Sequence, residues 1–79
     1  MSMSDYTPNS WSIIVFRSIH DVIKSERLIK DKGFDYQIIP VPTHISSECG
    51  MCIEVADNRL VETKIELDKY SIFHNIYTK

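Results

Sequence analysis

The hydrophobic and polar positions of the chain predict four strands. Residues 11–17 read W-S-I-I-V-F-R, so a strand here presents Ile13 and Val15 on one face and Ile14 and Phe16 on the other. A strand that is apolar on both faces is expected to be covered on both faces. The remaining predicted strands are residues 34–39, 51–55 and 72–77.

The segment between the first two strands is predicted to be a helix. Ser18 and Asp21 have the Ser-x-x-acid spacing of a capping box, and Gly33 ends the helix as a C′ residue does. The apolar residues expected on its buried face are Ile19, Val22, Ile23 and Ile29. Glu26 falls near the centre of this face and Leu28 falls opposite it, so either the helix is rotated or shortened relative to this prediction, or Glu26 has a function.

Residues 59–70 have a pattern that fits two structures. The residues that alternate there as in a strand are Val61, Thr63, Ile65 and Leu67. The same segment also fits a helix that begins with Asp57 or Asn58 as its N-cap. We predict the helix.

The resulting order of elements, β-α-β-β-α-β, is that of the ferredoxin-like plait. We therefore predict an α+β fold with an antiparallel four-stranded sheet and two helices on one of its faces. Residues 1–10 are polar and are expected to be a flexible N-terminal segment, whereas residues 11–79 are expected to form a single domain.

A proline-bounded arm is predicted between the second and third strands. Pro40-Val41-Pro42 favours an extended path that does not pair with a neighbour, because proline lacks an N–H donor. In the plait this arm emerges at the same end of the sheet as the junction between the first strand and the first helix. We therefore expect Arg17, Ser18 and His20 to lie near residues 43–50.

Composition and charge narrow the function classes. Nine Lys and Arg against eleven Asp and Glu give a net charge of −2, so nucleic acid is not an expected partner. The longest apolar runs are four residues, far short of a membrane span, and we expect a soluble, unexported, cytoplasmic protein with reduced thiols. A chain of 79 residues has a small core, and a deep substrate pocket is therefore expected only with a partner chain, which keeps a homodimer as an alternative.

Residues 43–52, T-H-I-S-S-E-C-G-M-C, contain the densest group of reactive side chains. Cys49 and Cys52 have the Cys-x-x-Cys spacing that serves dithiol–disulfide exchange, half of a tetrahedral zinc site, or capture of a soft ion. A structural zinc site needs four ligands, and the histidines that accompany the two thiols are His20, His44 and His74. No second Cys-x-x-Cys is present, and we expect neither a bound metal nor another cofactor.

Carrier or redox chemistry requires a thiolate, and an ordinary thiol with a pKa of about 8.5 needs positive charge nearby. We expect the N-terminus of the first helix to supply it beside Cys49. The expected thiolate-stabilising or binding residues are Arg17, Ser18, His20, His44, Ser46, Ser47 and Gly50. Cys52 is the second catalytic candidate, although strand alternation points it away from Met51 and Ile53. The alternative for either thiol is a small packing residue.

With these residues in view, the chain resembles the small bacterial selenium/sulfur carrier protein-like family. The matching features are His20, the stretch E-R-L-I at 26–29, Pro40-Val41-Pro42, and I-S-S-E-C-G at 45–50. The resemblance runs from about Ser12 to Tyr77. It implies that Cys49 holds sulfur or selenium as a persulfide or selenosulfide, taken from a donor protein and passed to an acceptor protein. Cys52 stands where the family more commonly has a small or apolar residue.

A carrier or binding protein is thus favoured over a turnover enzyme. The first alternative is a non-catalytic interaction or regulatory module that dimerises through the open sheet face, because the first strand is apolar on both faces. The second alternative is a metal site completed across a homodimer by two Cys-x-x-Cys pairs.

Overall fold

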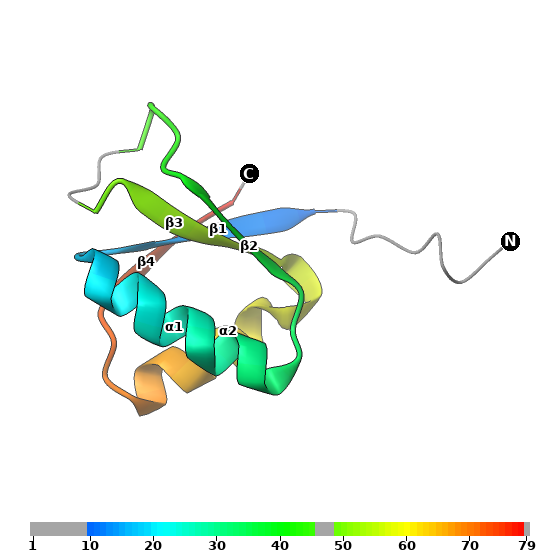
Figure 1. Cartoon of the computed structure of the whole chain (residues 1–79). Coiled ribbons are helices and arrows are strands. Elements are labelled where there is room, and N and C mark those ends of the chain that lie inside the picture. The colour runs from blue at the N-terminus through cyan, green and yellow to red at the C-terminus, as the bar shows by residue number, and fades with distance from the viewer. Residues whose placement is uncertain (1–9, 46–48, 79) are drawn as a thin grey trace, which may run out of the picture.

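The computed structural model of the chain describes residues 10–45 and 49–78, and these have the predicted βαββαβ order. The elements are β1 (Trp11–Phe16), α1 (Ile19–Lys32), β2 (Tyr36–Pro40), β3 (Met51–Ala56), the short 3-10 turn η2 (Asp57–Arg59), α2 (Leu60–Lys69) and β4 (His74–Thr78). The sheet is antiparallel throughout with the order β2-β3-β1-β4, and both helices lie on one face (Figure 1). The predicted α+β, ferredoxin-like arrangement is confirmed. No helix in the described ranges has the length and apolarity to cross a bilayer.

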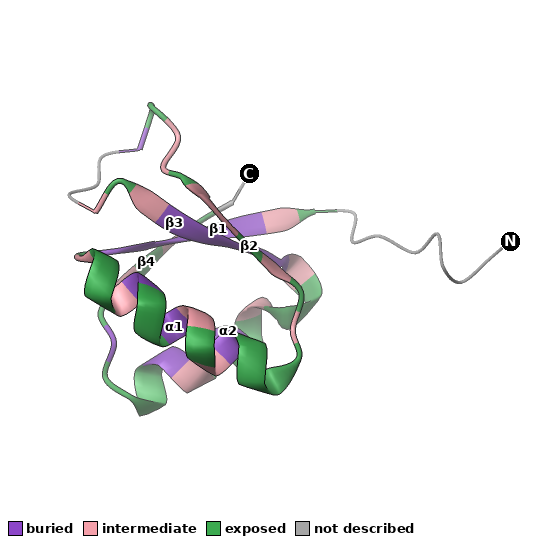
Figure 2. Ribbon diagram, in the orientation of Figure 1, coloured by how far each residue is buried: buried purple, intermediate pink, exposed green. Residues whose placement is uncertain are grey.

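The centre of the sheet is β1, which pairs with β3 on one side and with β4 on the other. Ile14 and Phe16 pack in one core with residues of both helices, which we call the helix-side core. Figure 2 shows the buried stretches of β1 and of the two helices. The buried members of this helix-side core are Ile14, Phe16, Val22, Ile29, Ile53, Val55, Leu67 and Ile72. Burial of these side chains against one another supplies the main driving force for folding.

The opposite face of β1 is covered by the segment that connects β2 to β3. Ile13 and Val15 pack there with Cys52 and Ile45, and Ile45 comes from that connection. These four residues, with the partly buried Ile39 and Val41 against them, form the open-face core. The expectation that β1 is covered on both faces is therefore confirmed, with helices on one side and an irregular segment on the other.

The proline-bounded arm pairs with β3, so the prediction of a non-pairing path is wrong. Pro40 is the last residue of β2 and lies opposite Met51, and the Val41 amide donates to the Gly50 carbonyl at 3.0 Å. Successive amides of a strand point to opposite sides, so Pro40 and Pro42 lack N–H groups only where the chain faces the open edge of the sheet. The two prolines therefore leave the ladder intact and block further pairing at that edge.

Helix α1 begins and ends as predicted, but it is rotated from the predicted position. Ser18 is the N-cap, its Oγ accepting from the Asp21 amide at 3.3 Å, and Gly33 ends the helix with φ 77°. The buried residues of α1 are Val22, Ser25 and Ile29, whereas Ile19 and Ile23 are exposed. Ser25 therefore lies at the centre of the observed buried face, and the prediction that Ile19 and Ile23 are buried is wrong.

This rotation also explains Glu26. Its carboxylate lies at the side of α1 and accepts a hydrogen bond from the Tyr36 hydroxyl at 2.8 Å, linking the helix to β2. The bond and the negative charge raise the pKa of Tyr36 above its ordinary value. Glu26 therefore has a structural contact, and Leu28 packs partly buried against the helix-side core.

Helix α2 is confirmed, but neither Asp57 nor Asn58 caps it. The N-cap is Arg59, whose side chain makes no capping bond, while the Asp57 carboxylate accepts from the hydroxyls of Ser10 and Ser12. The buried residues of α2 are Thr63 and Leu67, and Val61 and Ile65 are exposed. The two buried residues are four positions apart, which places them on one face of a helix. In a strand, Val61 and Ile65 would share their face and be buried as well.

Ser25 is expected to be replaceable by alanine with a gain in stability. Its side chain is fully buried, and its Oγ has no hydrogen-bond partner among the described residues. Ser25→Ala should raise the free energy of unfolding by about 1 kcal/mol, because it removes a desolvated hydroxyl and improves helix propensity. Urea denaturation followed by circular dichroism measures the change.

Thr63→Val is the matched control for this substitution. Thr63 is equally buried, but its Oγ1 donates to the Arg59 carbonyl at 2.8 Å. Loss of this hydrogen bond in Thr63→Val should lower the free energy of unfolding by about 1 kcal/mol. Equal destabilisation by both substitutions would contradict the assignment of Ser25 as unsatisfied.

Asp57 is expected to make stability depend on acid pH. Hydrogen bonds from Ser10 and Ser12 lower the pKa of Asp57 below the usual 3.8. A carboxyl group whose pKa is lower in the folded state contributes stability above its unfolded pKa and loses it as the pH falls through the folded pKa. The unfolding free energy should therefore drop below about pH 4, and Asp57→Asn should reduce this drop. Asp68→Asn, at an exposed carboxylate, is the control in the same pH series.

Candidate functional site

As predicted, the β1–α1 junction lies at the same end of the sheet as the start of β3. The register pairs Val15 with Cys52 and Pro40 with Met51, so the end of β1 and the start of β3 lie side by side. Figure 1 shows α1 beginning at this same end, below the connection from β2 to β3. The candidate site is therefore this end of the sheet, bounded by the first turn of α1 and by the start of β3. We call this end the sheet edge, and it is distinct from the lateral edge that β2 forms.

Cys49 lies at this edge and is only partly buried. Its side chain packs against the helix-side core, whose members include Phe16 and Val22. The next residue, Gly50, has φ 82° and is exposed, and an atom added at its Cβ position would meet nothing within 4 Å. The positive φ lets the chain turn into β3, and the missing side chain leaves open space beside the cysteine.

Cys52 is in a different environment. It is 0% exposed in the open-face core, and its Sγ lies 3.9 Å from the Pro40 carbonyl, to which the thiol donates. Cys49 belongs to the helix side of the sheet and Cys52 to the other side, because successive strand residues alternate in direction. The two thiols therefore do not form a dithiol pair in this structure, despite their Cys-x-x-Cys spacing.

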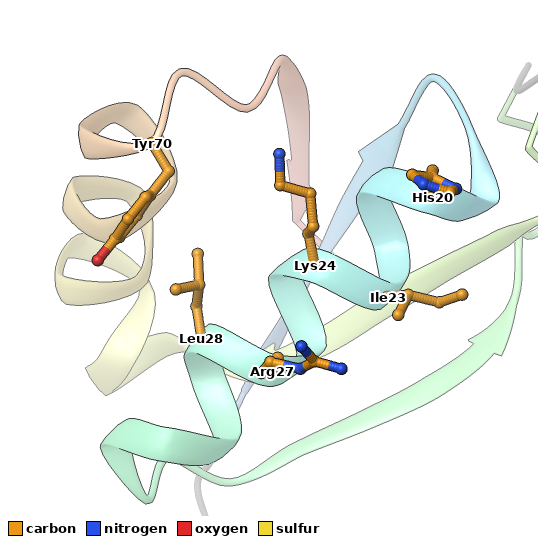
Figure 3. A pocket seen from close by; sticks show the side chains of 6 residues that line it. All are labelled: His20, Ile23, Lys24, Arg27, Leu28 and Tyr70. Carbon is orange, nitrogen blue, oxygen red and sulfur yellow. The ribbon is translucent and has the colours of Figure 1, made fainter.

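The other predicted site residues of the β1–α1 junction have contacts of their own. The Arg17 guanidinium stacks over the Phe73 ring at 3.9 Å from its centroid, next to β4 and away from β3. Ser18 caps α1. His20 is exposed on the first turn of α1 and lines a groove there (Figure 3).

Of the residues predicted on the β2–β3 connection, the structure describes His44, Cys49 and Gly50. His44 is exposed in a turn that the Ile45 amide closes on the Pro42 carbonyl at 3.0 Å. Ser46 and Ser47 lie outside the described residues, as do residues 1–9 of the predicted N-terminal segment. Cys49 and Gly50 are neighbours in the sequence, whereas the Arg17 side chain contacts Phe73 and Cys52 lies in the open-face core.

Sequence reasoning did not identify the groove. Its lining residues are His20, Ile23, Lys24, Arg27, Leu28 and Tyr70, around a volume of about 290 Å³ (Figure 3). The signal was present as basic residues three and four positions apart beside Ile23 on a helix. The groove does not follow from the predicted buried face of the helix, because that face includes Ile23, which is exposed.

Metal ligands are not assembled in the described part of the chain. Within residues 10–45 and 49–78, no group of three His, Cys, Asp or Glu side chains is placed to hold an ion. Because the two thiols lie on opposite faces of the sheet, they are not placed to bind one ion together.

These features define an α+β plait with a partly exposed cysteine at the edge where α1 and β3 begin. The chain belongs to the family described as "Putative Se/S carrier protein-like", whose model matches residues 12–77. No curated protein and no solved structure gives a significant match. The family resemblance found in the sequence is thereby confirmed over nearly the same residues.

The two thiols are expected to differ in alkylation. In the folded protein, iodoacetamide should modify Cys49 while Cys52, at 0% exposure, reacts at least about tenfold more slowly, because it must wait for local opening. In urea both should react alike. Peptide mapping of the alkylated protein measures the two rates, and equal rates in the folded protein would contradict the buried position of Cys52.

Proposed function

We propose that the protein is a sulfur or selenium carrier that holds its cargo on Cys49. The single observation that carries the proposal is the placement of Cys49 in a chain of the Se/S carrier-like family. This thiol is partly exposed at the sheet edge, next to the open turn at Gly50. Cys52 is a packing residue of the open-face core in this proposal.

The transfer step is an exchange between two sulfur atoms. The Cys49 thiolate attacks the outer sulfur of a donor persulfide, forming a new S–S bond as the S–S bond of the donor breaks. The donor leaves as a thiolate, and Cys49 becomes a persulfide without net oxidation or reduction. An acceptor nucleophile then takes the outer atom and releases the Cys49 thiolate. With selenium as cargo the same steps give a selenosulfide.

The surroundings of Cys49 support this exchange. Helix α1 starts at the same edge, and the N-terminus of a helix carries partial positive charge that favours an anion nearby. The open backbone at Gly50 leaves room for an adduct atom and for the attacking group of a partner. His44, which is exposed on the β2–β3 connection, is proposed to donate a hydrogen bond to the adduct. A donor and an acceptor protein are the expected partners, and the protein acts as a carrier without turnover of its own.

The alternative of dimerisation through the open sheet face receives less support. The centre of that face is formed by Ile13, Val15 and Cys52, all buried within the single chain beneath Ile45. An apolar face that its own chain covers has less area to offer to a second copy. The separation of the two thiols likewise weakens the alternative of a Cys-x-x-Cys metal site.

The carrier proposal predicts that one thiol accepts sulfur. After incubation of reduced protein with glutathione persulfide, intact-mass spectrometry should show a gain of one sulfur atom. Cys49→Ser should abolish this gain and Cys52→Ser should retain it, because only the first thiol is reachable by the donor. Cyanide should remove the added atom as thiocyanate and restore the starting mass.

Circular dichroism of both variants controls for loss of the fold. A mass gain that persists in folded Cys49→Ser, or that disappears equally in folded Cys52→Ser, would contradict the assignment of the cargo to Cys49. Absence of the gain in the wild-type protein would exclude the persulfide mechanism with this donor class.

A further inference from the structure

The groove on the outer side of α1 has an apolar floor that remains open to solvent. Ile23 is 51% exposed and Tyr70 is 52% exposed, although both are large apolar side chains. Tyr70 borders the groove from the segment after α2, and Ile23 and Leu28 border it from α1 (Figure 3). Exposed apolar side chains gathered in one concavity are typical of interaction sites.

The rim of this groove is basic. His20, Lys24 and Arg27 line it, and none of them forms an ion pair with another described residue. The ion pairs in the described part of the chain are Lys32–Glu66 at 3.4 Å, Arg59–Glu62 at 3.0 Å and Lys64–Asp68 at 3.1 Å. The lining thus contains two cations, Lys24 and Arg27, and no carboxylate, on a chain whose net charge is −2. Such a local excess attracts an acidic partner.

The size of the groove distinguishes between kinds of occupant. Its volume of about 290 Å³ lies at the lower limit of pockets that enclose a drug-sized ligand or cofactor, which span about 300 to 1,000 Å³. It has room for one or two apolar side chains of a longer segment. Two exposed basic side chains beside it, Lys24 and Arg27, suit carboxylates that flank such an anchor in sequence.

We infer that this groove binds an acidic segment of a partner protein. One apolar side chain of the segment inserts between α1 and Tyr70, and flanking carboxylates pair with Lys24 and Arg27. An anionic membrane fits these features less well, because the apolar side chains line a concavity and the two cations Lys24 and Arg27 are fewer than the roughly four to eight of a lipid-binding cluster. The inference concerns docking, and it stands whether or not Cys49 carries sulfur.

The position of the groove places a docked partner near the candidate site. His20 belongs to the first turn of α1, which begins at the sheet edge that contains Cys49. A segment bound along α1 therefore extends from the edge of the thiol toward the middle of the helix. A partner bound in the groove contacts residues other than Cys49, so binding to the groove and transfer to the thiol can be measured separately.

Peptide titration by nuclear magnetic resonance tests the inference. The probe is a short synthetic peptide in which glutamates flank a central leucine–phenylalanine pair. It should shift the amide signals of α1 and of Tyr70, with weaker binding at higher salt. Two control peptides, one with lysines replacing the glutamates and one with serines replacing the apolar pair, should not shift them.

The variant Lys24→Glu/Arg27→Glu should weaken binding of the acidic peptide about tenfold. Lys64→Glu makes the same kind of charge change outside the groove and should leave binding unchanged. Equal binding of the acidic and basic peptides, shifts located on another surface, or no shift at all would overturn the inference. Shifts of the same α1 signals by phosphatidylserine vesicles, without shifts by the peptide, would overturn it in favour of a membrane surface. Shifts of the α1 signals that depend on protein concentration alone would overturn the inference in favour of a second copy of the chain bound in the groove.

Discussion

The burial of β1 on both faces is the constraint on which the rest of this molecule depends. The strand lies between β3 and β4, and its four apolar residues 13–16 are buried on alternating sides. Each side needs its own cover, because leaving apolar side chains exposed to water is unfavourable in free energy. Helices α1 and α2 cover one side. The β2–β3 connection must therefore fold over the other, which a tight hairpin turn is too short to do.

This cover decides the environments of the two cysteines. Because side chains alternate along a strand, the turn at Gly50 and the start of β3 send Cys49 to the helix side and Cys52 to the opposite side. Ile45 then closes over Cys52, while Cys49 remains at the edge. The Cys-x-x-Cys spacing is typical of dithiols and metal sites, but here it places Cys49 at the sheet edge and Cys52 in the open-face core.

The same packing produces the groove on α1. Ser25 occupies the centre of the buried helix face, and Ile23 lies outside this face and is exposed. The turn after α2 brings Tyr70 beside it. Helix α1 lines the groove and begins at the sheet edge that contains Cys49, so a partner can be held by the groove while its reacting group approaches the sheet edge.

The sequence by itself determined the elements whose signals are local. Ser18 and Gly33 delimit α1 through hydrogen bonds and dihedral angles within one turn, and the unbroken apolar run of β1 predicts a strand buried on both faces. Only the tertiary structure decided the rotation of α1, the bonding of Asp57 to Ser10 and Ser12 in place of a helix cap, and the closure over Cys52. These features depend on which distant side chains meet, and that information resides in the packed arrangement and not in any local stretch of the chain.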